Sequence, residues 1–273
     1  MDATHSLERF AADIGPDEPV TPVGGRTQWT TGGLPSPPGR AVYAPGGVVS
    51  HQPEEMIVRV RAGTPVADLD AALAGRGQMV ALDPYDPEVA TVGGVLAVGR
   101  SGHRALRYGP VRDSVLEVRY VSDGGKLVKA GAPVVKNVSG FDLCRLLVGS
   151  LGTLGILAEV VLRCRPVPQS SQWLRTTLPA SEVRRRLFRP SCVVQDDRGA
   201  WVLLEGHPAD MADERASLGR GAVEVEAPTP EVLHRLLDRR HRPVPRDATL
   251  HRRVKDLFDP RGRLNPGRDP LAA

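Results

Sequence analysis

The chain has 273 residues, of which 41% are hydrophobic and 25% are charged, and its formal net charge is +4. These values are ordinary for a globular protein, and the 29 glycines and 25 prolines are too dispersed for a low-complexity chain. No apolar segment reaches the ~20 residues needed to span a bilayer. The N-terminal stretch MDATHSLERF lacks the apolar core of a signal peptide, so we expect a cytoplasmic protein.

The cysteines and the charged residues exclude two further classes of function. Cys144, Cys164 and Cys192 are too scattered for a metal or iron–sulfur site, and we expect buried, reduced thiols and no bound metal. Arginines gather near the C-terminus, but acidic residues are mixed among them and aromatic residues are few. We therefore expect no nucleic-acid binding.

The first regular elements are a strand and a helix. Residues 56–63 (MIVRVRAG) alternate as a strand does. Thr64 is then expected to cap a helix that has Pro65 at its first position. That helix has one apolar face, made by Val66, Leu69 and Leu73.

A hairpin and a glycine loop follow. Residues 115–121 (VLEVRYV) and 126–129 are predicted to be strands joined by a turn over Asp123, Gly124 and Gly125. A short helix with Leu143, Leu146 and Leu147 on one face precedes GSLGTLG (149–155), and a β-branched strand begins at Ile156. A Rossmann turn has its glycines after a strand and before a helix. Here the order is helix, glycine loop, strand, so a nucleotide would be bound in another way.

Beyond residue 166 the pattern changes. Predicted elements follow in the order strand, helix, strand, strand, helix, strand, which is the ferredoxin-like plan. We place a domain boundary near 166–168. A last helix precedes the turn-rich end FDPRGRLNPGR.

Four glycine-bearing loops lie before that boundary, at 22–29, 91–102, 107–113 and 149–155. Glycine lets backbone N–H groups approach an anion closely. A long dinucleotide such as FAD needs contacts at several separate places, which four loops can provide. Gly149 and Gly152 have a second interpretation, in which they only end a helix and allow tight packing.

Three stretches carry a family resemblance. ATVGGVLAVGRSGHRALRYGPVRDSVLEV, KNVSGFDLCRLLVGSLGTLGILAEVVL and FDPRGRLNPGR resemble the vanillyl-alcohol-oxidase type, or PCMH-type, FAD-binding flavoproteins. Within that family, AGTPVADLDAALAGRGQM and the second stretch are most similar to the FAD-binding subunits of bacterial glycolate oxidases.

The resemblance implies an α+β fold. Residues 1–165 would form a PCMH-type FAD-binding domain of two α+β subdomains. Residues 166–273 would form a short ferredoxin-like cap, or substrate domain, whose C-terminal tail returns to the flavin.

The resemblance also implies the residues that bind FAD. The first pyrophosphate loop would be Gly24, Gly25, Arg26 and Thr27. The second would be Thr91, Val92, Gly93 and Gly94, followed by Ser101 and Gly102. Gly155 and Ile156 would lie at the adenine or ribose end.

The sequence departs from the family in two places. Members with covalent flavin carry a histidine in the first glycine loop, and residues 22–29 contain none, so we expect non-covalent FAD. Residues 166–273 also lack the histidine-rich, metal-binding motif of the family's D-2-hydroxyacid dehydrogenases. No catalytic residue is therefore assigned. The tail arginines Arg261, Arg263 and Arg268 could bind a substrate carboxylate.

These features lead to one main hypothesis for the function. The chain is expected to be an FAD-dependent oxidoreductase subunit of a glycolate oxidase-like complex that oxidises a small 2-hydroxy acid. Companion flavoprotein and iron–sulfur subunits would work with it and would provide any membrane association. The alternative is a flavin-binding structural or electron-transfer subunit without catalysis of its own.

Overall fold

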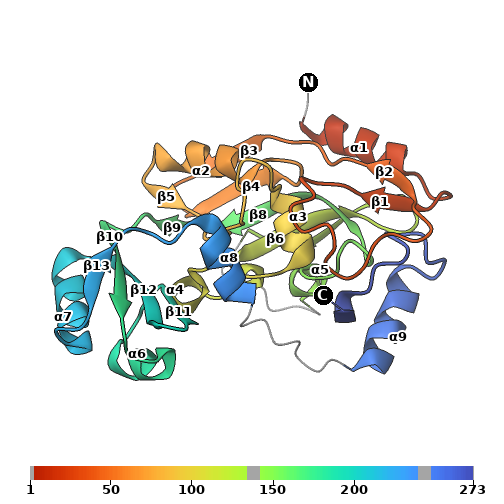
Figure 1. The fold of residues 1–273 in the computed structure, drawn as a ribbon. Coiled ribbons are helices and arrows are strands. Elements are labelled where there is room, and N and C mark those ends of the chain that lie inside the picture. Colours follow the sequence, from red (N-terminus) through yellow and green to blue (C-terminus); the bar gives the residue numbers. More distant parts are fainter. Residues whose placement is uncertain (1–2, 134–141, 239–246, 273) are drawn as a thin grey trace. The chain divides into compact units, whose positions relative to one another are not determined.

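A computed structural model describes residues 3–133, 142–238 and 247–272 of the chain (Figure 1). These residues form two compact units. The first comprises the described residues within 1–100, 111–165 and 243–273, and the second those within 101–110 and 166–242. Each unit contains hydrophobic cores of its own.

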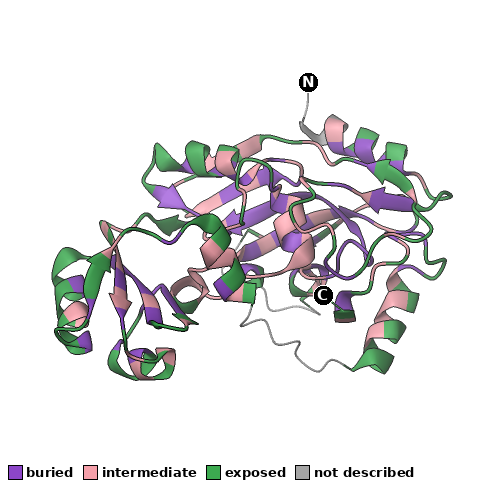
Figure 2. Cartoon of the chain, in the orientation of Figure 1, coloured by how far each residue is buried: buried purple, intermediate pink, exposed green. Residues whose placement is uncertain are grey.

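The first unit is built on an antiparallel sheet of five strands in the order β3-β4-β8-β6-β7. The strands are β3 (Val48–Gln52), β4 (Ile57–Arg61), β6 (Val115–Val121), β7 (Leu127–Gly131) and β8 (Ile156–Arg163). Seven of the eight residues of the central strand β8 are buried, which Figure 2 shows as a nearly continuous purple ribbon. Both faces of β8 therefore belong to cores: Leu157, Val160 and Leu162 to one, Ile156 and Ala158 to the other.

Helices supply the other side of each core. The larger core takes apolar side chains from α2 (Val66–Ala74), α3 (Val92–Val98) and α5 (Leu143–Leu147), and α9 (Ala248–Phe258) packs against it through Val254 and Phe258. The smaller core joins α1 (Ala3–Ile14) to the parallel pair β1 (Val20–Pro22) and β2 (Arg40–Val42). Short elements complete the chain: β5 (Gln78–Met79), the 3₁₀ turns Val111–Ser114 and Pro270–Ala272, and β9 (Arg165–Pro166).

The C-terminal tail is an integral part of this first unit. Val20 N–H donates to the Arg263 carbonyl at 2.9 Å, and Asn265 N–H donates to the Val20 carbonyl at 2.8 Å, so the tail runs parallel to β1. The Asp259 carboxylate accepts hydrogen bonds from the N–H groups of Arg263 and Leu264 at 3.0 and 2.8 Å. These bonds fix the tail beside the first glycine loop.

The second unit contains a four-stranded antiparallel sheet in the order β11-β12-β10-β13. Its elements are, in chain order, α4 (Ala105–Tyr108), β10 (Ser170–Thr176), α6 (Ala180–Arg186), β11 (Cys192–Asp196), β12 (Gly199–Gly206), α7 (Pro208–Leu218), β13 (Val223–Val225) and α8 (Pro230–Asp238). Val183 of α6 and Met211 of α7 pack on one face of the sheet, and Leu236 of α8 packs on the other. From β10 to β13 the element order is the one that the sequence predicts, and the ferredoxin-like assignment stays a prediction.

The mixed helix and sheet content confirms the α+β class, and the 115–129 hairpin, the helix before the glycine loop and the strand after it all form as predicted. The helix cap was predicted one residue too early. Pro65, not Thr64, is the N-cap of α2, because the Thr64 hydroxyl donates to the Arg61 carbonyl at 2.7 Å and accepts from Gly47 N–H at 2.8 Å. The helix α3 was missed, since its sequence was interpreted as a loop.

The units also differ from the predicted domains in two segments. Residues 101–110 group with the second unit, although they precede the predicted boundary. The described residues from 247 onward group with the first unit, although they follow that boundary. Between these segments, the chain passes from the first unit to the second after Arg165.

All three cysteines are buried and none forms a disulfide, as expected. Burial raises the pKa of the Cys144 thiol and that of the Cys164 thiol to about 11. A thiol with such a pKa stays protonated near neutral pH, and the protonated form is not the nucleophile. We therefore expect almost no reaction of the native protein with Ellman's reagent at pH 8, and reaction of three thiols after denaturation. Rapid reaction of one thiol in the native protein would contradict the burial.

Candidate functional site

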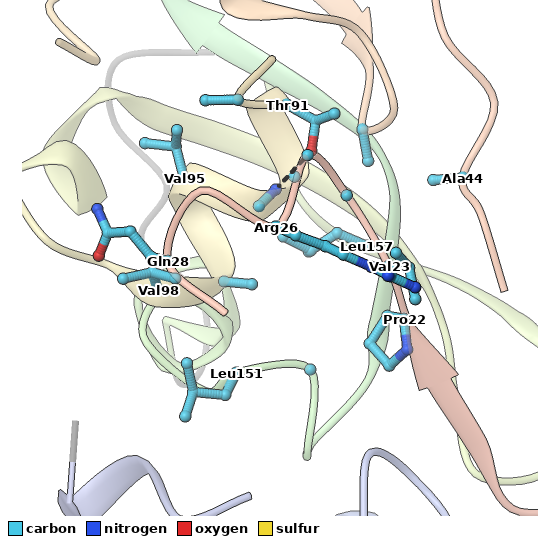
Figure 3. Close-up of a pocket in the computed structure, with 18 of the residues that line it drawn as sticks. Pro22, Val23, Arg26, Gln28, Ala44, Thr91, Val95, Val98, Leu151 and Leu157 are labelled. Carbon is cyan, nitrogen blue, oxygen red and sulfur yellow. Dashed lines mark hydrogen bonds between the residues drawn. The ribbon is translucent and has the colours of Figure 1, made fainter. Parts of the chain in front are cut away.

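An open cleft lies in the first unit (Figure 3). Its walls come from the loop after β1, the ends of β2 and β4, the helix α3, the glycine loop before β8 and the C-terminal tail. Small and apolar groups such as Val23, Ala44, Val95 and Leu157 make most of the surface. The charged side chains that line it are Arg26 and Arg268, so the cleft suits an elongated ligand with negative charge.

The loop 24–28 offers a row of hydrogen-bond donors. Within the described residues, none of its five consecutive backbone N–H groups has an acceptor. Arg26, in the middle, has a left-handed backbone with φ +56. Successive N–H groups around such a residue form a concave nest that binds anions. This loop is therefore the part of the cleft best suited to a phosphate group.

Glycine is required where this loop passes over the start of α3. A Cβ at Gly25 would lie 1.8 Å from the Val89 carbonyl oxygen, and a Cβ at Gly24 would lie 2.4 Å from Thr91 Oγ1. Both contacts are far shorter than real atoms allow. The two glycines thus let the loop lie directly on the backbone beneath it and hold its N–H groups in place.

The second predicted loop is the start of α3, and its backbone donors already have partners. Gly94 N–H donates to Thr91 Oγ1 at 3.1 Å, the bond dashed in Figure 3. Val92 N–H donates to the Thr64 carbonyl at 2.9 Å, and Gly93 N–H donates to the Ala62 carbonyl at 2.7 Å. This segment therefore contributes a rigid, glycine-lined wall, whereas unpartnered backbone donors come from the first loop.

The structure brings eight of the twelve predicted cofactor-binding residues together around the cleft: Gly24, Gly25, Arg26, Thr27, Thr91, Gly93, Gly94 and Ile156. Val92 does not line the cleft, because its side chain is fully buried in the larger core. Gly155 does not line it either, because it packs against the Tyr120 ring, 2.4 Å from where its Cβ would be. Ser101 and Gly102 belong to the second unit and are not among the lining residues.

Sequence reasoning missed several residues of the cleft wall. Gln28, Trp29 and Thr31 continue the first loop into the cleft, and Asn265 enters from the tail. Gly152 lines the cleft next to Pro22, so its role goes beyond ending a helix. The run GGRTQW offered a signal, since polar and aromatic side chains follow the glycines immediately.

Of the three tail arginines, Arg268 reaches the cleft. Arg261 forms an ion pair with Asp123 at 2.8 Å, and Arg263 donates to backbone carbonyls in the interior. The proposed carboxylate-binding role is therefore wrong for Arg263, whose side chain is buried and fully engaged away from the cleft.

The lining residues include no histidine, carboxylate, lysine, tyrosine or cysteine. Across the described residues, no group of three or more His, Cys, Asp or Glu side chains could hold a metal ion. The cleft can therefore bind an anionic ligand, but its own side chains offer no acid or base for proton transfer.

Comparison with known proteins points to FAD as the ligand. Residues 12–131 match the family model of the FAD binding domain. Within this range the chain is similar to FAD binding domains. The matched range includes both the loop 24–28 and the start of α3.

The relatives in sequence are oxidoreductases of 2-hydroxy acids. The chain is 38% identical to glycolate oxidase subunit GlcE of Escherichia coli over 181 residues, which are 63% of this chain and 52% of that protein. It is 36% identical to a D-lactate dehydrogenase of Anaerostipes hadrus over 162 residues, covering 56% and 32% of the two chains. It is 30% identical to glycolate oxidase subunit GlcD of Bacillus subtilis over 158 residues, covering 57% and 34%. The matches thus span about half or less of these relatives.

A solved structure of alkyldihydroxyacetonephosphate synthase shows the same fold. It matches with a TM-score of 0.64 and 18% identity, covering 86% of this chain and 54% of that one. The fold is therefore shared, with little sequence in common.

Gly25 offers a direct test of the site. Gly25→Ala places a methyl group against Val89 and forces the loop 24–28 to move. Overpacking of this kind costs about 1–3 kcal/mol, so we expect FAD affinity to fall roughly 10-fold or more. Gly75→Ala is the matched control, since Gly75 has φ −60 and no neighbouring atom within 4 Å of its Cβ position. Equal flavin content in both variants would show that the loop does not contact the cofactor.

Proposed function

We propose that this chain is the FAD-binding oxidoreductase subunit of a glycolate oxidase-like complex that acts on a small 2-hydroxy acid. The cleft with its nest at 24–28 carries the binding part of this proposal. The similarity to glycolate oxidase subunits and D-lactate dehydrogenases supports the reaction class. Because these relatives are oxidising enzymes, the similarity favours this function over a purely structural flavin subunit.

We propose that FAD is held without a covalent bond. Covalent flavin attachment needs a nucleophilic side chain, and the lining residues contain no histidine, cysteine or tyrosine. The diphosphate would lie in the nest of Gly24, Gly25, Arg26 and Thr27, beside Thr91, Gly93 and Gly94. Ile156 would contact the adenine or ribose end. The described residues hold the cofactor by shape, N–H donors and charge alone.

Bound FAD would supply a hydride acceptor for oxidation of the substrate alcohol. This chain's side chains would orient the cofactor and keep the cleft positively charged. The hydroxyl proton needs an acceptor, and the cleft lining has none. We therefore propose that a companion flavoprotein subunit completes the reaction and that an iron–sulfur subunit carries the electrons onward.

The similar proteins GlcE and GlcD are subunits of glycolate oxidase, which supports partners of this kind. Within the described residues, no helix is long and apolar enough to cross a bilayer. We propose a cytoplasmic protein that reaches the membrane only through its partners.

The mode of FAD attachment can be tested by acid precipitation of the purified protein. Since no lining residue can form a covalent link, precipitation should release the flavin into the supernatant in a 1:1 ratio to the chain. The control is a protein sample denatured by guanidinium and passed over a desalting column, which should emerge without yellow colour. Flavin that stays with the precipitated chain would contradict the proposal.

Catalysis can be tested on the isolated, FAD-loaded chain. A missing general base costs a factor of ~10²–10⁴ in rate, so we expect almost no dye reduction with glycolate or D-lactate. Addition of the companion subunits should restore turnover. Steady turnover by the homogeneous chain alone, at rates typical of enzymes, would show that it contains a base outside the cleft lining.

A further inference from the structure

Two arginines lie against the same indole ring at one wall of the cleft. The guanidinium carbon of Arg268 is 4.6 Å from the centroid of Trp29, and that of Arg26 is 5.1 Å from it. Figure 3 shows Arg26 extended along the cleft below Thr91. Cation–π contacts hold each guanidinium to the ring. They also keep two positive charges close together, which is unfavourable unless an anion balances them.

No anion of the described chain balances these charges. Neither arginine forms an ion pair with a carboxylate of the described residues. Arg268 Nη1 donates to the carbonyl oxygens of Trp29, Thr31 and Gly33, with 2.8 Å to Thr31. These bonds fix the guanidinium and leave its Nε, which is buried, without an acceptor. A fixed guanidinium at the wall of a cleft, with no carboxylate partner in the described residues, attracts a ligand anion by its charge.

The backbone of Arg26 is a second, independent indication. Its φ of +56 lies in the left-handed region, which costs an L-residue roughly 1–2 kcal/mol and is adopted readily by glycine. Arginine at this position therefore needs a reason other than the backbone. Strain of this kind concentrates at binding sites, where the side chain has a task.

We propose that Trp29 holds Arg26 and Arg268 as a paired cation site, and that this pair binds the diphosphate of the dinucleotide. This inference rests on the proposed FAD function. The diphosphate is favoured over a substrate carboxylate because Arg26 lies in the loop 24–28, whose N–H groups are unpartnered within the described residues. Positive charge and N–H donors thus meet on one doubly charged group.

The variant Arg26→Gly removes the positive charge of the side chain without disturbing the backbone of the loop. Glycine suits the left-handed backbone, so the variant should melt at the same or a higher temperature than the wild type. Hydrogen bonds to charged groups contribute enough that we expect FAD to bind roughly 10-fold or more weakly. The slope of log Kd for FAD against log salt should also become shallower. Riboflavin, which has no phosphate, should bind both proteins equally.

Three control measurements show whether a change in FAD binding comes from the arginine pair. Arg220→Gly removes an exposed arginine from the second unit and should change neither Kd nor salt dependence. Trp29→Phe keeps an aromatic ring and should weaken FAD binding less than Trp29→Leu. Inorganic diphosphate should raise the melting temperature of the wild type, and of Arg26→Gly much less.

The proposal is overturned if Arg26→Gly binds FAD with unchanged affinity and salt dependence, or if it loses riboflavin and FAD affinity equally. Those results leave the proposed function intact. If instead the wild type binds diphosphate but does not bind FAD, the result supports an anion site at Arg26 and Arg268 and contradicts the proposed function.

Discussion

The buried guanidinium of Arg263 joins the two ends of the first unit. Its side chain is 2% exposed and donates to the carbonyls of Ile14, Gly15, Glu18 and Asp123. Burial lowers the pKa of Arg263, because the charged form loses its hydration. The carbonyl oxygens replace that hydration, and loss of the side chain would leave them buried without a donor. Together with the backbone bonds of Val20 and the Asp259 carboxylate, this anchor fixes the tail that lines the cleft.

The residues that follow Arg263 in the tail connect the smaller core to the cleft. Leu264 lies in the smaller core, and Asn265 and Arg268 line the cleft. Asn265 Nδ2 donates to the Leu151 carbonyl at 2.6 Å, so the tail also fixes the glycine loop before β8. One wall of the cleft is thus made from residues more than a hundred positions apart in the chain.

Sequence patterns predicted those parts of the structure that local chemistry determines. The alternation of 115–121, the glycine turn after it and the β-branched run at 156–163 specify strands whichever partners they meet. The missed helix α3 is different. Gly93 and Gly94 lower its helix propensity, and its start is stabilised by the Thr64 and Ala62 carbonyls and the Thr91 hydroxyl. Two of these three acceptors lie in a preceding segment, so no local pattern contains them.

The residues of the candidate site also divide into those that local sequence indicates and those that depend on distant parts of the chain. Glycines at 24 and 25 are visible in the sequence because close backbone approach requires them. Arg268 became a site residue only through a family resemblance, since the carbonyls that fix it lie 235 to 239 residues away. The segment 101–110 groups with the second unit, although residues on both sides of it belong to the first, and nothing in its composition marks this change.

The charged groups of the cleft determine which ligands and which chemical steps its own residues can support. Two arginines without a carboxylate partner in the described chain, and five N–H groups without acceptors, favour any ligand that brings concentrated negative charge. The same absence of carboxylates and imidazoles from the lining removes the groups that accept protons at neutral pH. The chain spans about half the length of glycolate oxidase subunit GlcE. The cleft itself therefore favours an anionic ligand, whereas proton transfer requires a group that the cleft lining does not supply.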